Sequence, residues 1–462
     1  MKNIQLLILL FLLPITLTAQ ITFPDSGSGS GIGGPRLNIA IINAKIIDVE
    51  NGTLEEKQTI IIKDGLITEM KKNEVSIMPN TKIIDASGKY IMPGLVDAHI
   101  HFFQSGGLYT RPDAIDLQKY RPYKEEIAWL KKEAGAIAKR YLQAGITTVV
   151  DVGGPMHNYN IRNELNADTL APSIYLTGPL VSTYQPEAFK VDDPPIIKVN
   201  DTTEAKALVQ RQLPFFPDFI KIWYIARTPQ DALDTYPIIE ATMQEAKKNG
   251  LRVVVHATQL YTAKLAVKAG ADLLVHSVDA SIDKEFVSLL KANGTVYCPT
   301  LIVSANYSKV FTQQYQPTAE DYAYSPPVPL GSLMDIRHLP EPALKKQYLD
   351  LTDSFVERNK KGAAIMAANL MILMKAGIPI ATGTDAGNIG TLHVSSYFEE
   401  LRQMYKAGMT NEQILQACTI NGAKAVGKES EFGSVAVGKR ADLLILNKNP
   451  LTDIEHIKAL DR

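Results

Sequence analysis

The feature that most constrains the fold is a repeated alternation of strand-like and helix-like segments through the middle of the chain. Apolar runs of strand length occur at 146–151, 173–177, 219–224, 251–256, 271–276, 295–298 and 378–382. Helix-like stretches lie between them, at 125–143, 203–212, 238–249, 262–269 and 284–292. Several helices end in Ala-Gly or Asn-Gly just before the next run, where glycine fits the left-handed C-cap of a helix. This alternation is typical of an α/β fold with a parallel sheet.

Counted with the strand before His99, the pattern gives eight strand–helix units over 93–427. Eight units in a region of about 300 residues match the size of a TIM (β/α)8 barrel. A doubly wound open sheet is the alternative, but no Gly-x-Gly-x-x-Gly turn follows an early strand. The segment 303–362, rich in Tyr, Pro and charged residues, interrupts the alternation after the seventh strand. Insertions of this length are usually functional or disordered, and we expect this one to form a lid.

Both ends of this region have strand character. In 37–92, short β-rich runs alternate with the turn pairs Asn51-Gly52 and Asp64-Gly65, which are strong hairpin signals. Strand-like runs return within 428–462, at 432–435 and 439–446, after a helical stretch at 411–427. We therefore predict a small β-sandwich domain formed from both termini, 37–92 and 428–462, beside the barrel.

The N-terminal 19 residues have the pattern of a secretory signal peptide. Lys2 precedes an apolar run at 6–13, and small residues follow as far as Ala19. The run is too short to span a bilayer. Residues 20–36 are rich in Gly and Ser and predict a flexible linker. We expect export, to the periplasm, with no membrane association after the signal peptide is removed.

Charge and cysteine content exclude some partners. A formal net charge of −1 provides no electrostatic case for binding nucleic acid or an anionic membrane. Cys298 and Cys418 are too few for a disulfide framework, and we expect two buried thiols. The expected partner is a small-molecule substrate; a homo-oligomer is compatible with the sequence.

Chemistry-bearing residues stand at the ends of several predicted strands. His99 and His101 share one face of an extended segment, an arrangement that suits a divalent metal. Catalytic groups of a barrel lie at the carboxyl ends of its strands. The other strands carry Lys221, His256, His276 and Asp385 at or near these ends. Each histidine alone could be a core residue with a hydrogen-bond partner, but the set together indicates a metal centre of nitrogen and oxygen ligands.

Lys221 is the unusual member of this set, because an ammonium group repels metal ions. The residue either pairs with an acid or a substrate carboxylate, or is uncharged. An uncharged lysine can take up carbon dioxide to form a carbamate, whose two oxygens can bridge two metals. A mononuclear site with unmodified Lys221 also stays open.

The order His-x-His, Lys, His, His, Asp resembles the amidohydrolase superfamily, in particular its imidazolonepropionase-related branch, which includes metal-dependent Xaa-Pro dipeptidases. The resemblance rests on the segments 93–101, 144–149, 298–301, 384–387 and 438–443. It implies two divalent metals, with zinc expected. His99, His101 and Asp385 would then hold the more buried metal. His256 and His276 would hold the other, and carboxylated Lys221 would bridge the two.

The resemblance also implies a mechanism, in which a metal-bridging hydroxide attacks the carbonyl. Asp385 would act as general base and then as general acid. Two substrate loops depart from the dipeptidase pattern. Residues 177–186 lack the histidine of the usual Gly-Gly-His-Gly segment, and 224–228 lack a Gly-Gly turn. His157, Tyr224 and Arg227 are candidate substrate contacts, although each could equally be a surface or packing residue.

We therefore predict an exported metal-dependent amidohydrolase that cleaves an amide or other C–N bond in a dipeptide, an N-acyl amino acid or a cyclic amide. A lactonase or phosphotriesterase using the same metal site is the alternative enzyme. A non-catalytic binding protein on a barrel scaffold is the alternative from another class.

Overall fold

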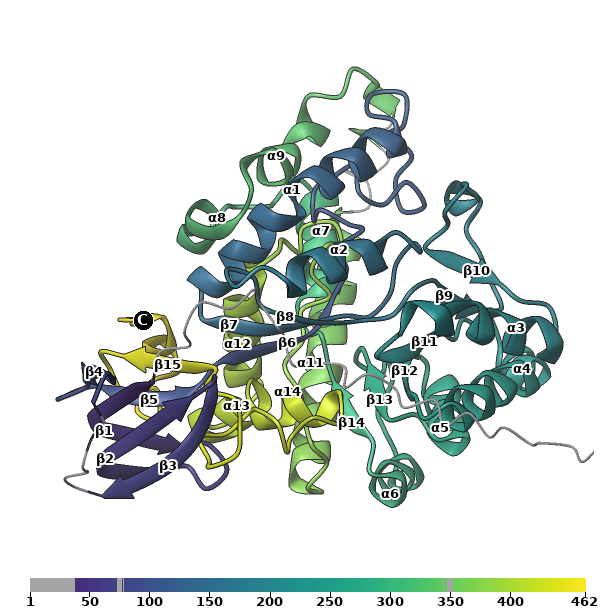
Figure 1. The fold of residues 1–462 in the computed structure, drawn as a ribbon. Coiled ribbons are helices and arrows are strands. Elements are labelled where there is room, and N and C mark those ends of the chain that lie inside the picture. The colour runs from purple at the N-terminus through teal and green to yellow at the C-terminus, as the bar shows by residue number, and fades with distance from the viewer. Residues whose placement is uncertain (1–37, 73–76, 78, 344, 347–351) are drawn as a thin grey trace, which may run out of the picture.

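The computed structural model describes residues 38–72, 77, 79–343, 345–346 and 352–462 (Figure 1). The predicted signal peptide at 1–19 and linker at 20–36 lie outside the described residues. No helix in the described part of the chain is both long enough and apolar enough to cross a membrane.

Strands from both ends of the chain form one mixed six-stranded sheet, at the lower left of Figure 1. Its strands are β1 (Ile39–Asp48), β2 (Thr53–Lys63), β3 (Leu66–Lys72), β4 (Lys82–Asp85), β5 (Tyr90–Pro93) and β15 (Leu443–Leu446). The C-terminal β15 pairs antiparallel with β5, so the two ends share strands. The predicted hairpins are confirmed, and Asp64 and Gly65 both have positive φ, as a type I′ turn requires. The sandwich and the domain boundaries stay predictions.

The expected strand at 432–435 is wrong. Residues 432–434 form a bend, and β15 begins only at Leu443. Phe432 is instead buried, and its ring stacks on Tyr175 at a centroid distance of 5.9 Å. An apolar residue in this segment therefore marks a contact with the core rather than a paired strand.

The middle of the chain contains two parallel sheets. The first consists of β6 (Leu95–Ile100), β7 (Ile146–Asp151) and β8 (Ser173–Leu176), in that order. The second has the order β10-β9-β11-β12-β13-β14. Its strands are β9 (Leu180–Ser182), β10 (Ile196–Lys198), β11 (Phe219–Trp223), β12 (Arg252–His256), β13 (Leu273–Val275) and β14 (Val296–Cys298). Parallel strands alternating with helices confirm the α/β character of this region.

The segment 378–386 lies between the two sheets, although it is not the regular strand expected at 378–382. It forms isolated parallel bridges from Ile380 to Tyr297 of β14 and from Ala386 to Ile100 of β6. The backbone of Ala98 also donates to the carbonyl of Thr382 at 2.9 Å. Pro379 contributes no N–H, which interrupts a regular ladder at this point.

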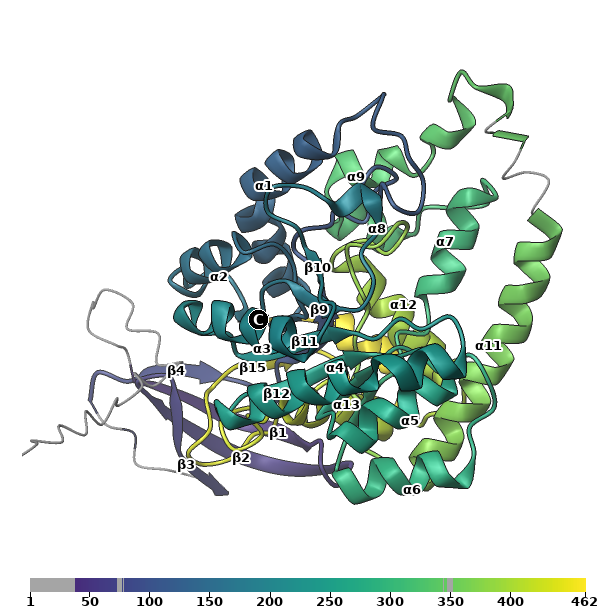
Figure 2. The same ribbon diagram turned by 90° about the vertical axis from the view of Figure 1, so that its right-hand side faces the viewer.

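Helices cover the outer faces of the sheets (Figures 1 and 2). They are α1 (Tyr123–Gln143), α2 (Asn158–Asn166), α3 (Thr202–Gln212), α4 (Pro229–Lys248), α5 (Leu260–Ala269), α6 (Lys284–Asn293), α12 (Ser395–Lys406), α13 (Asn411–Ala417) and α14 (Ile420–Ala425). α4 begins earlier than the expected 238, because the Thr228 side chain caps its first turn and the helix continues through Pro237. The helix expected at 411–427 is two helices, interrupted at Cys418 and Thr419.

The insertion is helical in its described part. It contains α7 (Val303–Phe311), α8 (Ala319–Tyr324), α9 (Pro327–Ser332) and the start of α11 (Thr352–Lys375), which packs beside α7 (Figure 2). The expected boundary at 362 therefore falls inside a helix. An apolar cluster that includes Val310, Leu330 and Ile336 joins the insertion to Leu108 and Ile115, in the loop after β6. Residues 344 and 347–351 lie outside the described part, and the lid stays a prediction.

Candidate metal centre

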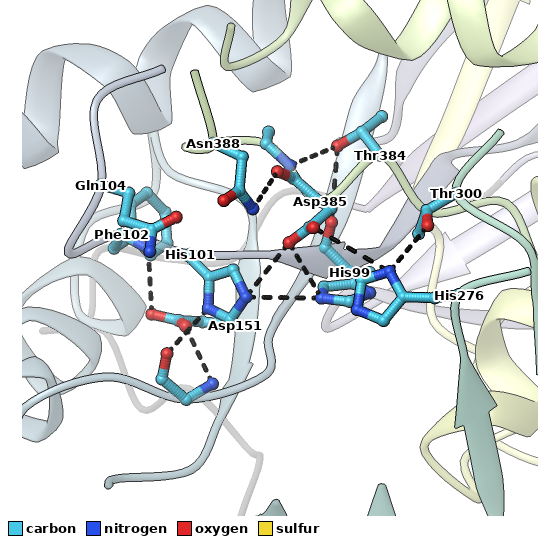
Figure 3. A network of polar contacts seen from close by, with 12 residues as sticks. His99, His101, Phe102, Gln104, Asp151, His276, Thr300, Thr384, Asp385 and Asn388 are labelled. Carbon is cyan, nitrogen blue, oxygen red and sulfur yellow. Dashed lines mark hydrogen bonds and ion pairs between the residues drawn. The ribbon is translucent and has the colours of Figure 1, made fainter. Parts of the chain in front are cut away.

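Three side chains converge at the carboxyl end of β6 (Figure 3). Oδ1 of Asp385 lies 3.1 Å from Nε2 of His99 and 3.2 Å from Nε2 of His101. The two Nε2 atoms are 3.4 Å apart. Ligand atoms around a tetrahedral zinc ion are roughly 3.3 Å from one another, since each bond measures about 2.0–2.1 Å. The three atoms thus have the mutual spacing of ligands to one metal.

Backbone bonds bring these residues together. The N–H of Asp385 donates to the carbonyl of His99 at 2.7 Å, and Asp385 has a φ of +59°. Asp97, buried below His99, accepts from the hydroxyl of Thr384 at 2.8 Å and from its N–H at 3.0 Å. A non-glycine residue at positive φ is strained, and the bonds on either side of Asp385 hold it there.

His101 is oriented by a partner outside the pocket. Its Nδ1 lies 2.8 Å from the carbonyl oxygen of Gly153 and donates to it, which leaves Nε2 as the nitrogen that faces the cavity. The carboxylate of Asp151 accepts from the N–H groups of Phe102 and Gly153 and from the Asn158 amide. These bonds fix the segment that presents His101, while burial raises the pKa of Asp151 to about 7.

The second pair of histidines lies beside the first. The rings of His256 and His276 are 4.3 Å apart between centroids, and those of His99 and His276 are 4.8 Å apart. Nδ1 of His276 lies 2.9 Å from Oγ1 of Thr300 and 3.9 Å from Oδ2 of Asp385. Burial lowers the pKa of His99 to about 4 and holds those of His256 and His276 well below the ordinary value. The imidazoles are therefore neutral near pH 7, as metal ligands must be.

Lys221 and Asp385 complete the site. The side chain of Lys221 is 1% exposed, and its Nζ has no hydrogen-bond partner among the described residues. Burial lowers the pKa of Lys221 to about 7, against the opposing charge of Asp385. Burial raises the pKa of Asp385, but its imidazole neighbours outweigh this and hold the pKa well below its usual range.

The donor set fits a divalent metal. Lys221 Nζ is buried and has no hydrogen-bond partner in the described part of the chain. Buried polar atoms are ordinarily paired, so this amine indicates a missing binding partner. Neutral imidazoles and an ionised carboxylate are ligands suited to zinc and similar ions.

A cavity of about 550 Å³ is lined by all six predicted ligand residues. One wall is apolar and includes Phe103, Leu180 and Trp223. The structure therefore brings together the set that the sequence places at separate strand ends.

The three expected substrate contacts lie outside this cavity lining. Nδ1 of His157 lies 3.0 Å from a carboxylate oxygen of Asp193. Tyr224 is buried, and its hydroxyl donates to the carbonyl of Ala232 at 2.5 Å. Arg227 is exposed. Alternation along β11 explains the position of Tyr224, because Lys221 and Trp223 face the cavity and the intervening residues face the helices.

Other cavity residues were not anticipated from the sequence. Asn388 accepts at Oδ1 from Nη1 of Arg111 and, at 2.8 Å, from the hydroxyl of Tyr307. Arg111 is held by Asp113, with bonds of 2.7 Å and 2.6 Å to its two carboxylate oxygens. Strand alternation from Lys221 could have identified Trp223, whereas no local pattern places Arg111 or Tyr307 in this site.

Comparisons with known proteins identify the family. The model of the Amidohydrolase family matches residues 90–461. An imidazolonepropionase from Shouchella clausii is 23% identical over 412 residues, covering 82% of this chain and 76% of the relative.

Two solved structures share the fold. A Xaa-Pro dipeptidase with methionine bound in its active site has a TM-score of 0.67 at 24% identity, covering 92% of this chain and 97% of that one. The ochratoxinase of A. niger has a TM-score of 0.64 at 20% identity, covering 92% and 94%. Because the family match spans most of the chain, this protein belongs to the amidohydrolase family and is a hydrolase that acts on carbon–nitrogen bonds.

Proposed function

We propose that this protein is an exported hydrolase with two zinc ions that cleaves an amide bond in a dipeptide, an N-acyl amino acid or a cyclic amide. The observation that carries this proposal is the convergence of His99, His101 and Asp385, whose nearest nitrogen and oxygen atoms lie 3.1–3.4 Å apart. Lys221 lines the same cavity, and its buried amine has no hydrogen-bond partner among the residues that the structure describes.

The scaffold that we infer is a closed (β/α)8 barrel. Residues 173–182 contain both β8 and β9 and so connect the two parallel sheets through the chain itself. On the other side, 378–386 bonds to both β14 and β6. Counted in this way, eight segments follow one another around a ring, and the site lies at their carboxyl ends as in other barrel enzymes.

The residues divide into two ligand groups around Lys221. His99, His101 and Asp385 would hold one metal, and His256 and His276 the other. Lys221 would join the groups as a carbamate, for which its depressed pKa provides the neutral amine. When bound, the metals would supply Lewis acidity, which lowers the pKa of a water molecule and polarises a carbonyl group.

The chain's own residues orient the substrate and move the proton. Asp385 is ionised, and its Oδ2 would accept a proton from the attacking water and return it to the leaving amine. The apolar wall with Phe103, Leu180 and Trp223 would pack against an apolar part of the substrate and exclude bulk water. Arg111, Tyr307 and Asn388 line the same cavity and offer polar contacts.

The compounds to be tested as substrates are chosen from the names of the relatives. A cyclic amide corresponds to the imidazolonepropionases, and a dipeptide corresponds to the Xaa-Pro dipeptidase. Export is supported by Lys2, the apolar run at 6–13 and the small residues up to Ala19.

The test is the metal content of zinc-grown protein, measured by plasma mass spectrometry. Wild type should contain close to two zinc ions per chain, and Lys221→Ala should lose metal. Lys264→Ala is the matched control, because Lys264 pairs with Asp283 and Glu285 away from the cavity. Amides, a lactone and a phosphotriester should then be assayed together. One metal unaffected by Lys221→Ala would refute the bridged centre, and wild type without metal would refute the proposal.

A further inference from the structure

Glu400 is a fully buried carboxylate outside the cavity lining, with 0% of its surface exposed. It lies on α12 and accepts from the backbone N–H of Leu301 at 2.9 Å and of Ile302 at 3.2 Å. Burying a carboxylate costs free energy unless its oxygens find donors. Burial raises the pKa of Glu400 to about 8, and both of its oxygens can accept a backbone N–H bond whether or not the group is ionised. Its two bonds thus connect α12 to the segment that follows β14.

That segment has a strained backbone. Thr300 has a φ of +45°, a conformation that β-branched residues rarely adopt. His276, at the end of the neighbouring strand, has a φ of +76°. The hydroxyl of Ser277 donates to the carbonyl of Pro299 at 2.9 Å, and the backbone N–H of His276 donates to the backbone carbonyl of Cys298 at 2.9 Å. Strain of this kind persists only where the surroundings hold it, and Glu400 holds the two amides directly after Thr300.

Thr300 connects this turn to the metal centre. Its Oγ1 lies 2.9 Å from Nδ1 of His276, and Figure 3 marks this contact with a dashed line. A partner on one ring nitrogen fixes the orientation of a ligand histidine and the nitrogen that is left for the metal. The contacts therefore run from Glu400 through the backbone of Leu301 and Ile302 to Thr300 and then to His276.

We propose that Glu400 is a positioning residue of the metal centre, which holds the 299–302 turn in its strained form so that Thr300 orients His276. This inference rests on the proposed function, since it assigns Glu400 a role only if His276 binds metal. Gln at this position keeps one acceptor but turns an N–H₂ group toward a backbone N–H. Val at position 300 removes the hydroxyl and keeps the shape.

The test uses cobalt-loaded protein, whose visible spectrum reports ligand geometry independently of activity. Glu400→Gln should weaken one of the two cobalt sites by about 10- to 100-fold and change its spectrum. The double variant Glu400→Gln/Thr300→Val should bind cobalt with an affinity within about twofold of that of Thr300→Val alone. Both changes interrupt the same series of contacts from Glu400 to His276, so their effects should not add. Asp218→Asn is the matched control, because Asp218 also accepts a backbone bond, from Leu176 at 2.8 Å, but precedes β11 at its opposite end. That variant should lose stability and keep the wild-type spectrum.

Wild-type cobalt affinity and spectrum in folded Glu400→Gln would overturn the inference, as would additive effects in the double variant. If Glu400→Gln does not fold, Glu400→Asp decides, because it keeps both oxygens and shifts them by one methylene. An unchanged spectrum in that variant overturns the inference, and a changed spectrum supports it. Wild type that binds no cobalt would instead refute the proposed metal centre itself.

Discussion

Nε2 of His99 lies 3.1 Å from Oδ1 of Asp385, although the two residues come from the first and last segments of the parallel region. The carbonyl of His99 also accepts the backbone N–H of Asp385 at 2.7 Å. The main-chain pairing of β6 with 378–386 therefore also sets the distance between two ligand side chains. The candidate metal centre depends on this contact between the ends of the region.

Asp385→Asn should abolish most of the activity and leave the fold intact. Asparagine keeps the shape but cannot accept the proton, and such proton transfer contributes about 10²- to 10⁴-fold to rate. We expect kcat to fall by that factor, measured beside circular dichroism. Asp283→Asn, which changes a helix-capping carboxylate outside the cavity lining, should retain kcat. An Asp385→Asn variant that keeps more than a tenth of the wild-type kcat would contradict the role of Asp385 as proton acceptor.

His393 should make the metal-free protein less stable at acid pH. It is fully buried between the Tyr141 hydroxyl and the Gln104 carbonyl, and burial lowers its pKa from 6.5 to about 4. The unfolded chain then binds more protons between these values, so stability falls as pH falls from 6.5 toward 4. Between pH 7 and pH 5 the free energy of unfolding should drop by about 2 kcal/mol from this residue.

Urea unfolding in a chelator checks this expectation. His393→Gln should start less stable at pH 7, because its hydrogen bonds are changed, but should lose less stability on acidification. The other histidines are present in both proteins, so their contributions cancel when the pH dependence of the unfolding free energy is compared between wild type and His393→Gln. Equal pH dependence in the two proteins would show that His393 is not neutral and buried as described.

Tyr224→Phe should affect stability and not substrate binding. Its hydroxyl bonds to the Ala232 carbonyl inside the fold, and losing that bond should cost about 1 kcal/mol. Thermal unfolding measures the loss, and KM for the best substrate of the panel should stay at the wild-type value. An increased KM at unchanged stability would restore Tyr224 as a substrate contact.

Tyr307→Phe should raise KM as well as lower stability. Tyr307 lines the cavity and donates to Asn388, so its removal changes the polar wall and leaves most packing intact. We expect KM to rise roughly tenfold, because a polar contact worth about 1.4 kcal/mol is removed from the cavity, and stability to fall by about 1 kcal/mol with the loss of the bond to Asn388. Steady-state kinetics beside Tyr224→Phe separates the two tyrosines.

Export should be visible in the mass of the mature chain. If the signal peptide spans 1–19, protein isolated from the periplasm of a bacterial host should begin at Gln20. Intact-mass spectrometry of fractionated cells measures this. Lys2→Glu together with a charge inside 6–13 should leave the full-length chain in the cytoplasm, and an unprocessed wild-type chain there would refute the signal.

The sequence by itself determined much of the local structure and the set of candidate ligands. Turn pairs such as Asp64-Gly65, the helix-ending Gly270 and the spacing of His99 and His101 depend on dihedral preferences and strand periodicity, which act over a few residues. Because parallel strands align their carboxyl ends, the same periodicity was enough to bring His256 and Asp385 to one place. The alternation of side chains along the strand from Lys221 also predicts that Trp223 faces the cavity and that Tyr224 does not.

Only the tertiary structure decided the rest of the site. Arg111 comes from a loop, Tyr307 from the insertion, and Glu400 from a helix on the outside of the sheet. Their directions depend on packing between segments distant in sequence, which no local period encodes. The positive φ of Thr300 and His276 is likewise imposed by bonds from other elements, against the preference of the residues themselves. Local preferences thus specified which groups could bind a metal, and long-range packing specified how they are held.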